Sequence, residues 1–170
     1  INMLSTSMHH SRFVIEAMNK GATFVVIDPV RTRTARRAHH HIKPKPGTDV
    51  VLAMAIANFL IKENLVDMDY VKKYTLGFDD FAERARQFSL DYAHEVTRVP
   101  AQQIKDLALL MVDNKAVAIR TGVALERTAN GGDAVRAIAS LPALTGSWRL
   151  PGGGIFQHPQ GTFPINRNAL

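Results

Sequence analysis

Two carboxylates in the first third of the chain lie where a ligand could be bound. Asp28 directly follows the β-branched and aromatic run 23–27, which predicts a strand buried on both faces in a parallel sheet. Ligands of α/β sheets bind beyond the carboxyl ends of the strands, where an acidic side chain commonly accepts hydrogen bonds from ribose hydroxyls. Asp-Pro is also an ordinary turn, so the sequence alone supports a ribose site and a structural turn about equally.

Asp49 is the second candidate, at the end of a turn that begins at Pro46. A carboxylate in this position can accept hydrogen bonds from the two adjacent N–H donors of a guanine base. Thr48 or Asp49 can equally cap the apolar helix predicted from about residue 50 to residue 63. The spacing does not separate these two interpretations.

Arginines alternate with threonines just after Asp28. The segment contains Arg31, Thr32, Arg33, Thr34, Arg36 and Arg37. Guanidinium groups beside hydroxyls suit phosphate oxygens, although a solvated helix face is the favoured interpretation for Arg36 and Arg37. Much of the net charge of +6 lies between Arg31 and Lys45, which favours a site for an anionic ligand over a general surface property.

Several catalytic and metal-binding patterns are absent from the sequence. There is no Gly-x-Gly-x-x-Gly loop, so an ordinary NAD site loses its main support. No Ser-His-Asp, lysine-based or paired-carboxylate arrangement stands out, and the lack of cysteine excludes disulfides and cysteine-ligated metals within these residues. Neighbouring strand residues point to opposite sides, so His39–His41 are interpreted as surface histidines. The sequence therefore predicts a binding site, with no catalytic residue and no metal ligand assigned.

Strands and helices alternate along the chain, which predicts an α/β fold with crossover connections. We predict strands at 23–27, 41–43 and 116–119 and helices at 11–20, 50–63, 64–77, 77–88, 89–99, 100–112 and 133–144. The first helix places Phe13, Val14, Ala17 and Met18 on one face. Pro142 is expected to disturb the last turn of the final helix, and the chain is expected to be irregular from Thr145.

Two or three convincing strands are few for an independent sheet. We therefore expect a Rossmann-like three-layer domain with a mostly parallel sheet and flanking helices that lacks its first strand, which would directly precede Ile1. Gly122, just after the strand 116–119, would allow the backbone to approach a ligand closely.

The composition of the 170 residues is that of an ordinary globular domain, with 46% hydrophobic and 21% charged residues. No apolar stretch reaches the roughly 18 residues that a membrane span requires. A sequence pI of about 9.9 keeps a nucleic-acid-binding domain open as an alternative, but no aromatic residues interleave with the arginines as a stacking platform would require. A nucleotide-binding domain from an unrelated α/β enzyme is the third candidate, because fold alone does not fix function.

Taken together and in order, five pieces of the chain resemble the molybdopterin oxidoreductases, the dimethyl sulfoxide reductase superfamily. They are Asn2, GATFVVIDPVRTRTARRA, KPGTDVVLAMAIANFLIKENLVDMDYV, TLGFDDF and LTGSWRLPGGG. The resemblance runs from about Asn2 to Gly154. The IDP segment with its following threonine and alanine, and PGTD before an apolar helix, are specific as a pair. Members of this superfamily carry molybdenum in a bis(molybdopterin guanine dinucleotide), or bis-MGD, cofactor.

The resemblance implies an internal cofactor-binding domain of a catalytic subunit several times this length. Residues 1–154 would form the domain, and 155–170 an irregular tail leading into the next one. The parent enzyme would transfer oxygen atoms or electrons, whereas the isolated chain is expected to be inactive and to hold no cofactor. Iron–sulfur clusters, where present, would lie elsewhere in the parent. Partners would be the rest of the catalytic subunit and an electron-transfer subunit. Neither a nucleic-acid partner nor a membrane segment in this chain is expected. The compartment could be the cytoplasm or the periplasm of a prokaryote.

The resemblance also assigns three groups of residues to the cofactor. The cofactor would run along Asn2, Met3, Leu4 and Ser5. The guanosine end of one dinucleotide would be bound by Asp28, Pro29, Val30 and Arg31 together with Gly47, Thr48 and Asp49. The pterin would be approached by Gly122 and Leu125. This assignment favours the binding interpretation of Asp28 and Asp49 over the structural one. Gln157 and His158 are candidates to face the metal pocket.

Overall fold

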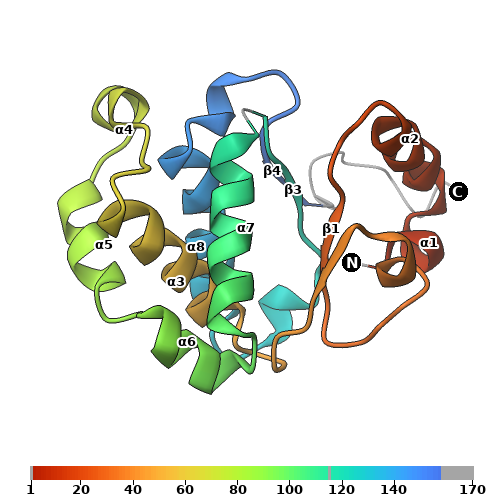
Figure 1. Cartoon of the computed structure of the whole chain (residues 1–170), viewed down its shortest axis with the longest axis horizontal. Helices are drawn as coiled ribbons and strands as arrows, with labels where there is room; N and C mark the ends of the chain where they lie inside the picture. Colours follow the sequence, from red (N-terminus) through yellow and green to blue (C-terminus); the bar gives the residue numbers. More distant parts are fainter. Residues whose placement is uncertain (1, 115, 158–170) are drawn as a thin grey trace, which may run out of the picture.

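The computed structural model describes residues 2–114 and 116–157, which fold into helices surrounding a central helix and into short parallel strands (Figure 1). In chain order the elements are α1 (Met3–Thr6), α2 (Met8–Asn19), β1 (Val25–Ile27), the 3₁₀ helix η1 (Ala35–Arg37), β2 (His40–Ile42), α3 (Asp49–Lys62), α4 (Met68–Tyr74), α5 (Phe78–Ala85), α6 (Leu90–Thr97), α7 (Ala101–Asp113), β3 (Ala118–Arg120), η2 (Leu125–Arg127), α8 (Gly131–Leu144), η3 (Ser147–Arg149) and β4 (Gly154–Phe156).

Helix α3 is the centre of the hydrophobic core. Its buried side chains come from every side of the helix: Leu52, Ala53, Met54, Ala55, Ile56, Ala57, Phe59 and Leu60. A helix that is apolar all round is stable only when it is enclosed, and α5, α6, α7 and α8 all contact α3. Its one polar central residue, Asn58, donates a hydrogen bond to the carbonyl oxygen of Phe88 at 3.0 Å and so ties α3 to the connection before α6.

The strands are parallel, as predicted, but they form two sheets of two strands each. Val26 of β1 lies opposite His41 of β2, and Ile119 of β3 lies opposite Ile155 of β4. Within the described residues β1 and β3 each pair with a single neighbour, so the expected single sheet is not formed. Strand β4 was not predicted, because its glycine-rich surroundings carry no alternating or β-branched pattern.

The burial of both faces that was predicted for the first strand is wrong in the structure. β1 and β3 are not buried on both faces: Ile27 is 41% exposed and Ala118 is also exposed. The apolar face of α2 is open as well, with Phe13 59% exposed and no buried residue in the helix. Both differences have one reason, which is that no described residue covers these surfaces.

Pro142 does not end α8 early. The helix continues to Leu144, and the amide of Thr145 still donates to the carbonyl of Leu141 at 3.1 Å. The domain boundary expected at residue 154 falls at the start of β4, and the rest of the expected tail beyond residue 157 lies outside the described residues. Among the described residues, no helix is both long and apolar enough to cross a lipid bilayer.

The burial of α3 gives a direct test of the core. Leu60→Ala removes a fully buried side chain and should lower the free energy of unfolding by about 2–5 kcal/mol, because the cavity cannot fully collapse among four packed helices. Leu76→Ala, at a fully exposed leucine, is the matched control and should change it by less than about 0.5 kcal/mol. Urea unfolding followed by circular dichroism measures both; equal effects of the two substitutions would contradict the assignment of α3 as the core helix.

Candidate functional site

A buried threonine fastens the first predicted cofactor segment to the arginine segment. The hydroxyl of Thr34 donates to Oδ1 of Asn2 at 2.6 Å and accepts a hydrogen bond from the amide of Leu4 at 3.0 Å. The side chain is buried, so this hydroxyl cannot contact a phosphate. The phosphate contact that the sequence suggested for Thr34 is therefore wrong. The hydroxyl of Thr32 is likewise used internally, because it accepts from the amide of Ala35 at 3.2 Å. Both threonines shape the turn, and the arginines alone remain for an anionic ligand.

The four residues of the first segment are therefore not equivalent. Asn2 and Leu4 are half-buried, Ser5 is exposed, and Met3 is buried in the protein interior. A ligand running along this segment would contact Ser5 and the exposed parts of Asn2 and Leu4. Met3 would instead pack in the interior beneath them.

Asp28 combines a structural role with a position open to a ligand. Its Oδ1 accepts a hydrogen bond from the amide of Val30 at 2.8 Å, which is the ordinary turn that the Asp-Pro pair predicts. The side chain is half-buried, while Pro29, Val30 and Arg31 are exposed around it. The carboxylate is thus held at the end of β1 by one oxygen.

Asp49 lies in the first turn of α3, and neither it nor Thr48 provides the cap that the sequence allowed. The hydroxyl of Thr48 donates to the carbonyl oxygen of Lys45 at 2.7 Å, and α3 has no side-chain cap. Asp49 is half-buried, and burial raises the pKa of its carboxyl. No other described residue donates a hydrogen bond to this carboxylate, so it is available to a ligand. Gly47 has a φ of +78°, which the tight turn before α3 requires.

The end of β3 contains polar atoms that the sequence analysis missed. Nε of Arg120 and the hydroxyl of Thr121 are buried, and neither has a hydrogen-bond partner among the described residues. Buried polar atoms are nearly always paired, so these two are candidates to meet a group bound next to Gly122. Their position at a strand end, beside a glycine already singled out, was the signal that could have identified them.

Gly131 is a second residue that the sequence did not single out. A Cβ atom at this position would lie 2.5 Å from the carbonyl oxygen of Leu125 and 2.7 Å from Cα of Glu126. The start of α8 therefore packs directly on the backbone of η2. This contact fixes half-buried Leu125, one of the predicted pterin-contacting residues, relative to the core.

The structure brings some of the predicted residues together and leaves others apart. Asn2–Ser5 and the segment after Asp28 are joined through Thr34. Within the described residues, no hydrogen bond joins Asp49 or Gly122 to either of them. The predicted residues thus lie at or near the ends of strands and the starts of helices.

His39 and His41 make hydrogen bonds within the chain. Nδ1 of His39 accepts a hydrogen bond from the amide of Phe24 at 2.9 Å, and Nε2 of His41 lies 2.9 Å from the carbonyl oxygen of Asp28. In the described part of the chain, no cluster of three or more histidine and carboxylate side chains could hold a metal ion. Gln157 donates to the carboxylate of Glu126, and His158 lies outside the described residues.

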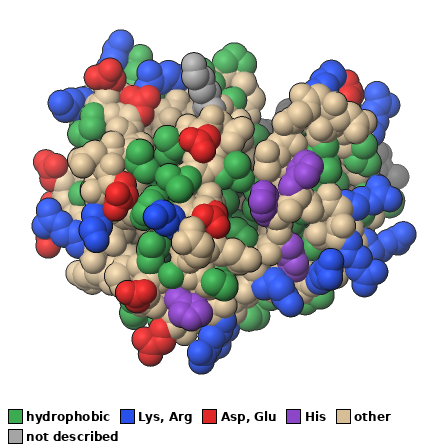
Figure 2. All heavy atoms as spheres, in the orientation of Figure 1, with side chains coloured by type: hydrophobic (Ala, Val, Ile, Leu, Met, Phe, Trp, Pro, Cys, Tyr) green, Lys and Arg blue, Asp and Glu red, His purple; other side chains and the backbone are tan. Residues whose placement is uncertain are grey.

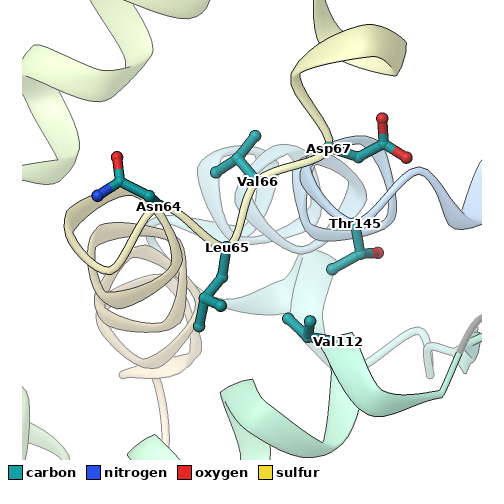
Figure 3. Close-up of a pocket in the computed structure, with 6 residues that line it drawn as sticks. All are labelled: Asn64, Leu65, Val66, Asp67, Val112 and Thr145. Atoms are coloured by element: carbon teal, nitrogen blue, oxygen red, sulfur yellow. The ribbon is translucent and has the colours of Figure 1, made fainter.

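A hollow of about 320 Å³ lies away from all the predicted residues. Its lining residues, Asn64, Leu65, Val66, Asp67, Val112 and Thr145, come from the connection after α3, the end of α7 and the end of α8 (Figure 3). Its one ionisable side chain, Asp67, is already engaged by its neighbours. The hollow therefore offers few free polar groups with which to bind a ligand.

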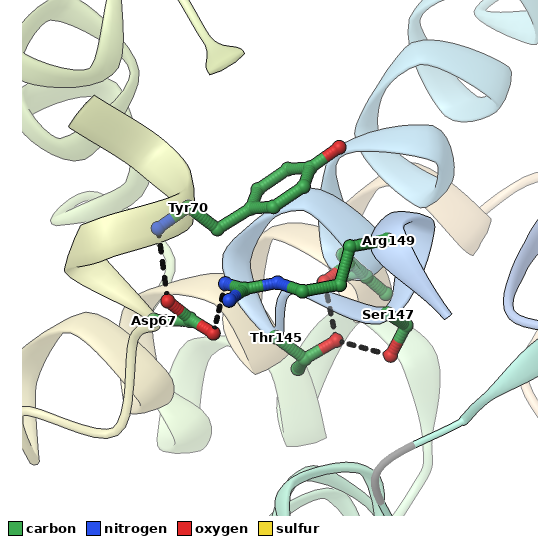
Figure 4. A network of polar contacts seen from close by, with 6 residues as sticks. Asp67, Tyr70, Thr145, Ser147 and Arg149 are labelled. Carbon is green, nitrogen blue, oxygen red and sulfur yellow. Dashed lines mark hydrogen bonds and ion pairs between the residues drawn. The ribbon is translucent and has the colours of Figure 1, made fainter. Parts of the chain in front are cut away.

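Asp67 belongs to a polar network that closes the glycine-rich turn (Figure 4). It accepts a hydrogen bond from the amide of Tyr70 at 2.9 Å, which caps α4, and it forms an ion pair with Arg149. The Arg149 guanidinium also lies over the ring of Tyr70, 5.1 Å from its centre. Gly146 has a φ of +67°, which disfavours any other residue, and a Cβ there would press on the side-chain ends of Asp67 and Arg149. Gly146 thus serves the close packing of this turn.

This network makes stability depend on pH. The amide of Tyr70, followed by Arg149, lowers the pKa of Asp67, so its stabilising effect is full above the ordinary carboxyl pKa and is lost as the pH falls through the lowered value. Asp67→Asn should lower the free energy of unfolding at pH 7 by less than about 1 kcal/mol, because the ion pair is partly exposed. Asp67→Ala should cost about 1 kcal/mol more by removing the cap.

Urea unfolding at pH 7 and at pH 2.5 tests this expectation. The difference between wild type and Asp67→Asn should shrink at the lower pH. Asp69→Asn, at an exposed carboxylate in the same turn of α4, is the matched control and should show a smaller pH-dependent difference. Equal pH dependence of the two variants would rule out a special role for Asp67.

The link between Thr34 and Asn2 is tested by Thr34→Val, which keeps the shape of the side chain but removes its hydroxyl. The substitution leaves the amide of Leu4 without a partner and should cost about 1–3 kcal/mol of unfolding free energy. The Leu4 amide should also exchange its hydrogen faster. Thr23→Val, at an exposed threonine before β1 whose hydroxyl makes no hydrogen bond within the described residues, should leave both quantities nearly unchanged. An unchanged Leu4 exchange rate in Thr34→Val would show that the link does not hold the segment.

Comparisons with known proteins identify the family of this chain. The family described as molybdopterin oxidoreductase matches residues 1–165. The chain is 39% identical over its whole length to the probable oxidoreductase YoaE of Bacillus subtilis, covering 25% of that protein. It is 35% identical over 148 residues to dimethyl sulfoxide/trimethylamine N-oxide reductase of Rhodobacter capsulatus, covering 82% of this chain and 18% of that protein.

The fold matches a solved structure as well. Acetylene hydratase from Pelobacter acetylenicus superposes with a TM-score of 0.78 at 29% identity, over 81% of this chain and 19% of that one. The chain thus spans a quarter or less of each of these relatives. In these relatives the matched segment is one part of a much longer chain, and this chain belongs to the molybdopterin oxidoreductase family.

Proposed function

We propose that this chain binds the guanosine end of a molybdopterin guanine dinucleotide inside a larger molybdenum-dependent oxidoreductase. The observation that carries the proposal is the half-buried carboxylate of Asp49, to which no other described residue donates a hydrogen bond. In a chain of this family, such a carboxylate suits the two adjacent N–H groups on the edge of a guanine base.

The other residues would contact the remaining parts of the ligand. Asp28, held by the amide of Val30, would accept hydrogen bonds from the ribose hydroxyls. Gly47 would let the backbone pass close to the base, and Gly122 and Leu125 would lie toward the pterin. The unpaired atoms of Arg120 and Thr121 support this last assignment, because a polar group bound beside Gly122 would give them partners.

When bound, the cofactor would supply a molybdenum centre that changes oxidation state as the parent enzyme transfers oxygen atoms or electrons. The part played by this chain is to orient the nucleotide. The rest of the catalytic subunit would complete the bis-MGD cleft, with 155–170 leading into its next domain. An electron-transfer subunit and iron–sulfur clusters would belong to the parent.

The proposal includes a further strand lying between β1 and β3. Each of these strands has one free edge in the described part of the chain, both sheets are parallel, and two-stranded sheets are marginal by themselves. An extended apolar strand would form backbone hydrogen bonds with the free edges of both β1 and β3. It would thereby join the four strands into a single Rossmann-like sheet. It would also lie next to the exposed side chain of Ile27.

The test is a two-dimensional amide NMR titration of the chain with GMP, with AMP as control. GMP should shift the amides near Asp28, Arg31 and Thr48–Asp49 and bind about tenfold more tightly than AMP, because adenine lacks the paired donors that a carboxylate recognises. Binding in the millimolar range is sufficient. Equal responses to the two nucleotides would contradict a guanosine site.

Asp49→Asn should abolish the preference for GMP, since a neutral amide cannot accept both hydrogen bonds. Asp91→Asn, at an exposed carboxylate in the first turn of α6, is the matched control and should keep the preference. Burial raises the pKa of Asp49, so GMP binding should weaken as the pH falls through a value above that of an ordinary carboxyl group. A preference that survives in Asp49→Asn would remove this residue from the site.

A further inference from the structure

Asn130 and Gly131, at the start of α8, form a pair of residues that is chemically labile in polypeptides. Of the asparagines in this chain, Asn130 is the only one that a glycine follows. The backbone nitrogen of the next residue can attack the carbonyl carbon of an asparagine side chain, and a glycine has no Cβ to block that approach. The proposed function assigns no role to Asn130.

The side chain of Asn130 is free to react. It is exposed, and although it directly precedes α8, it neither caps the helix nor makes a hydrogen bond within the described residues. Other asparagines are engaged by the fold: Asn58 donates to the carbonyl oxygen of Phe88, and Asn114 donates to that of Leu110 at 2.7 Å. No contact in the described part of the chain holds the Asn130 amide away from its neighbour.

The attacking nitrogen, in contrast, is held by the fold. The amide of Gly131 donates a hydrogen bond to the carbonyl oxygen of Thr128 at 3.0 Å, and the amide of Ala134 donates to that of Asn130 at 2.9 Å. The Gly131 nitrogen must lose its hydrogen to the solvent before it attacks, so the turn 128–131 has to open first. The rate of the reaction therefore depends on how often this turn opens.

Packing explains why a glycine follows Asn130. A Cβ on Gly131 would lie 2.5 Å from the carbonyl oxygen of Leu125, whereas a Cβ on Gly132 would have no other atom within 4 Å. A side chain at position 131 would hinder the attack, but it would also push α8 away from the backbone of η2. The close contact between these two elements therefore keeps the labile pair in the chain.

We infer that Asn130 is a site of spontaneous deamidation, which proceeds when the turn before α8 opens. The deprotonated nitrogen of Gly131 forms a bond to Cγ of Asn130, and the side-chain nitrogen takes up a proton and leaves as ammonia. Water then opens the cyclic imide at either of its carbonyl carbons, which gives aspartate or isoaspartate. Each turnover consumes a water molecule and releases ammonia, and no electrons are transferred. The reaction is independent of the proposed function.

The isoaspartate product should alter the contact between α8 and η2. Its main chain runs through Cβ and Cγ of the former asparagine, and the extra carbon would move Gly131 from its fitted position. Both products replace a neutral amide by a carboxylate and so lower the formal net charge of +6 by a single unit. Lysine and arginine side chains gather on the lower right of the face in Figure 2, so the chain should bind a cation exchanger and its modified form should elute earlier.

The test is incubation of the 170-residue chain at mildly alkaline pH, followed by digestion with trypsin and mass spectrometry. The peptide 128–136 should gain the mass expected when an acid replaces an amide, and fragmentation of its backbone should identify aspartate and isoaspartate. The peptide 13–20 is the internal control, because its Asn19 is also exposed but is followed by lysine. Its modification should be at least about tenfold slower, because a side chain on the next residue hinders ring closure.

Equal modification of the two peptides would overturn the inference. The same incubation in urea unfolds the chain and should speed the reaction at Asn130 by about tenfold, because the hydrogen bond between Gly131 and Thr128 is then lost. An equal rate with and without urea would contradict control by the opening of the turn.

Two glycine variants test the role of packing. Gly131→Ala should slow deamidation and lower the urea concentration at which the chain unfolds, whereas Gly132→Ala should leave the deamidation rate within about twofold and should not lower that urea concentration. Gly131→Ala as stable as the wild type would show that packing does not keep a glycine at this position. Asn130→Asp adds the carboxylate without the extra carbon, so it should shift the amides of 125–127 less than isoaspartate does; equal shifts would contradict a displaced contact.

Discussion

The burial of helix α3 is the constraint on which the rest of the molecule depends. Its apolar residues face every direction, so the helix is stable only when other helices enclose it, and α5, α6, α7 and α8 do so. That enclosure also fixes Asp49, because the carboxylate lies in the first turn of the same helix. A rigid core element thus carries the side chain proposed to recognise guanine, and few further contacts are needed to position it.

The part of the molecule around β1, β2 and α2 is built differently. It buries few side chains, and α2 buries none. Its order depends instead on specific polar links, chiefly that of Thr34 with Asn2 and Leu4. Regions with few buried apolar contacts open more easily than a packed core, so this part should be the less stable one in the isolated chain.

Glycine has two different roles near the proposed ligand sites. Gly47 permits a tight turn before α3 with a positive φ. Gly131 instead allows close packing, because a Cβ there would meet the backbone of η2. Gly154 combines both roles: its φ is +109°, and a Cβ on it would lie 2.7 Å from the ring of Trp148. The glycine-rich segment after α8 is therefore a packed turn.

The sequence by itself determined the helices from α2 to α8, the parallel direction of the strands and the family. These depend on local patterns: an apolar run long enough for a buried helix, β-branched runs that end at turns, and ordered segments such as IDP and PGTD. It also identified Asp28, Asp49 and Gly122 as residues at strand ends or helix starts, because that position follows from the element boundaries.

Tertiary structure decided which side chains are free to act. Thr34 and Asp49 are both polar residues in segments that the sequence singled out. The hydroxyl of Thr34 donates a hydrogen bond to Asn2, whereas no other described residue donates a hydrogen bond to the carboxylate of Asp49. Likewise, only the packing of η1 against α1 and α2 turns an arginine-rich segment into one wall of a hollow. Hydrogen-bond partners and burial depend on residues distant in the chain, and so local patterns cannot supply them.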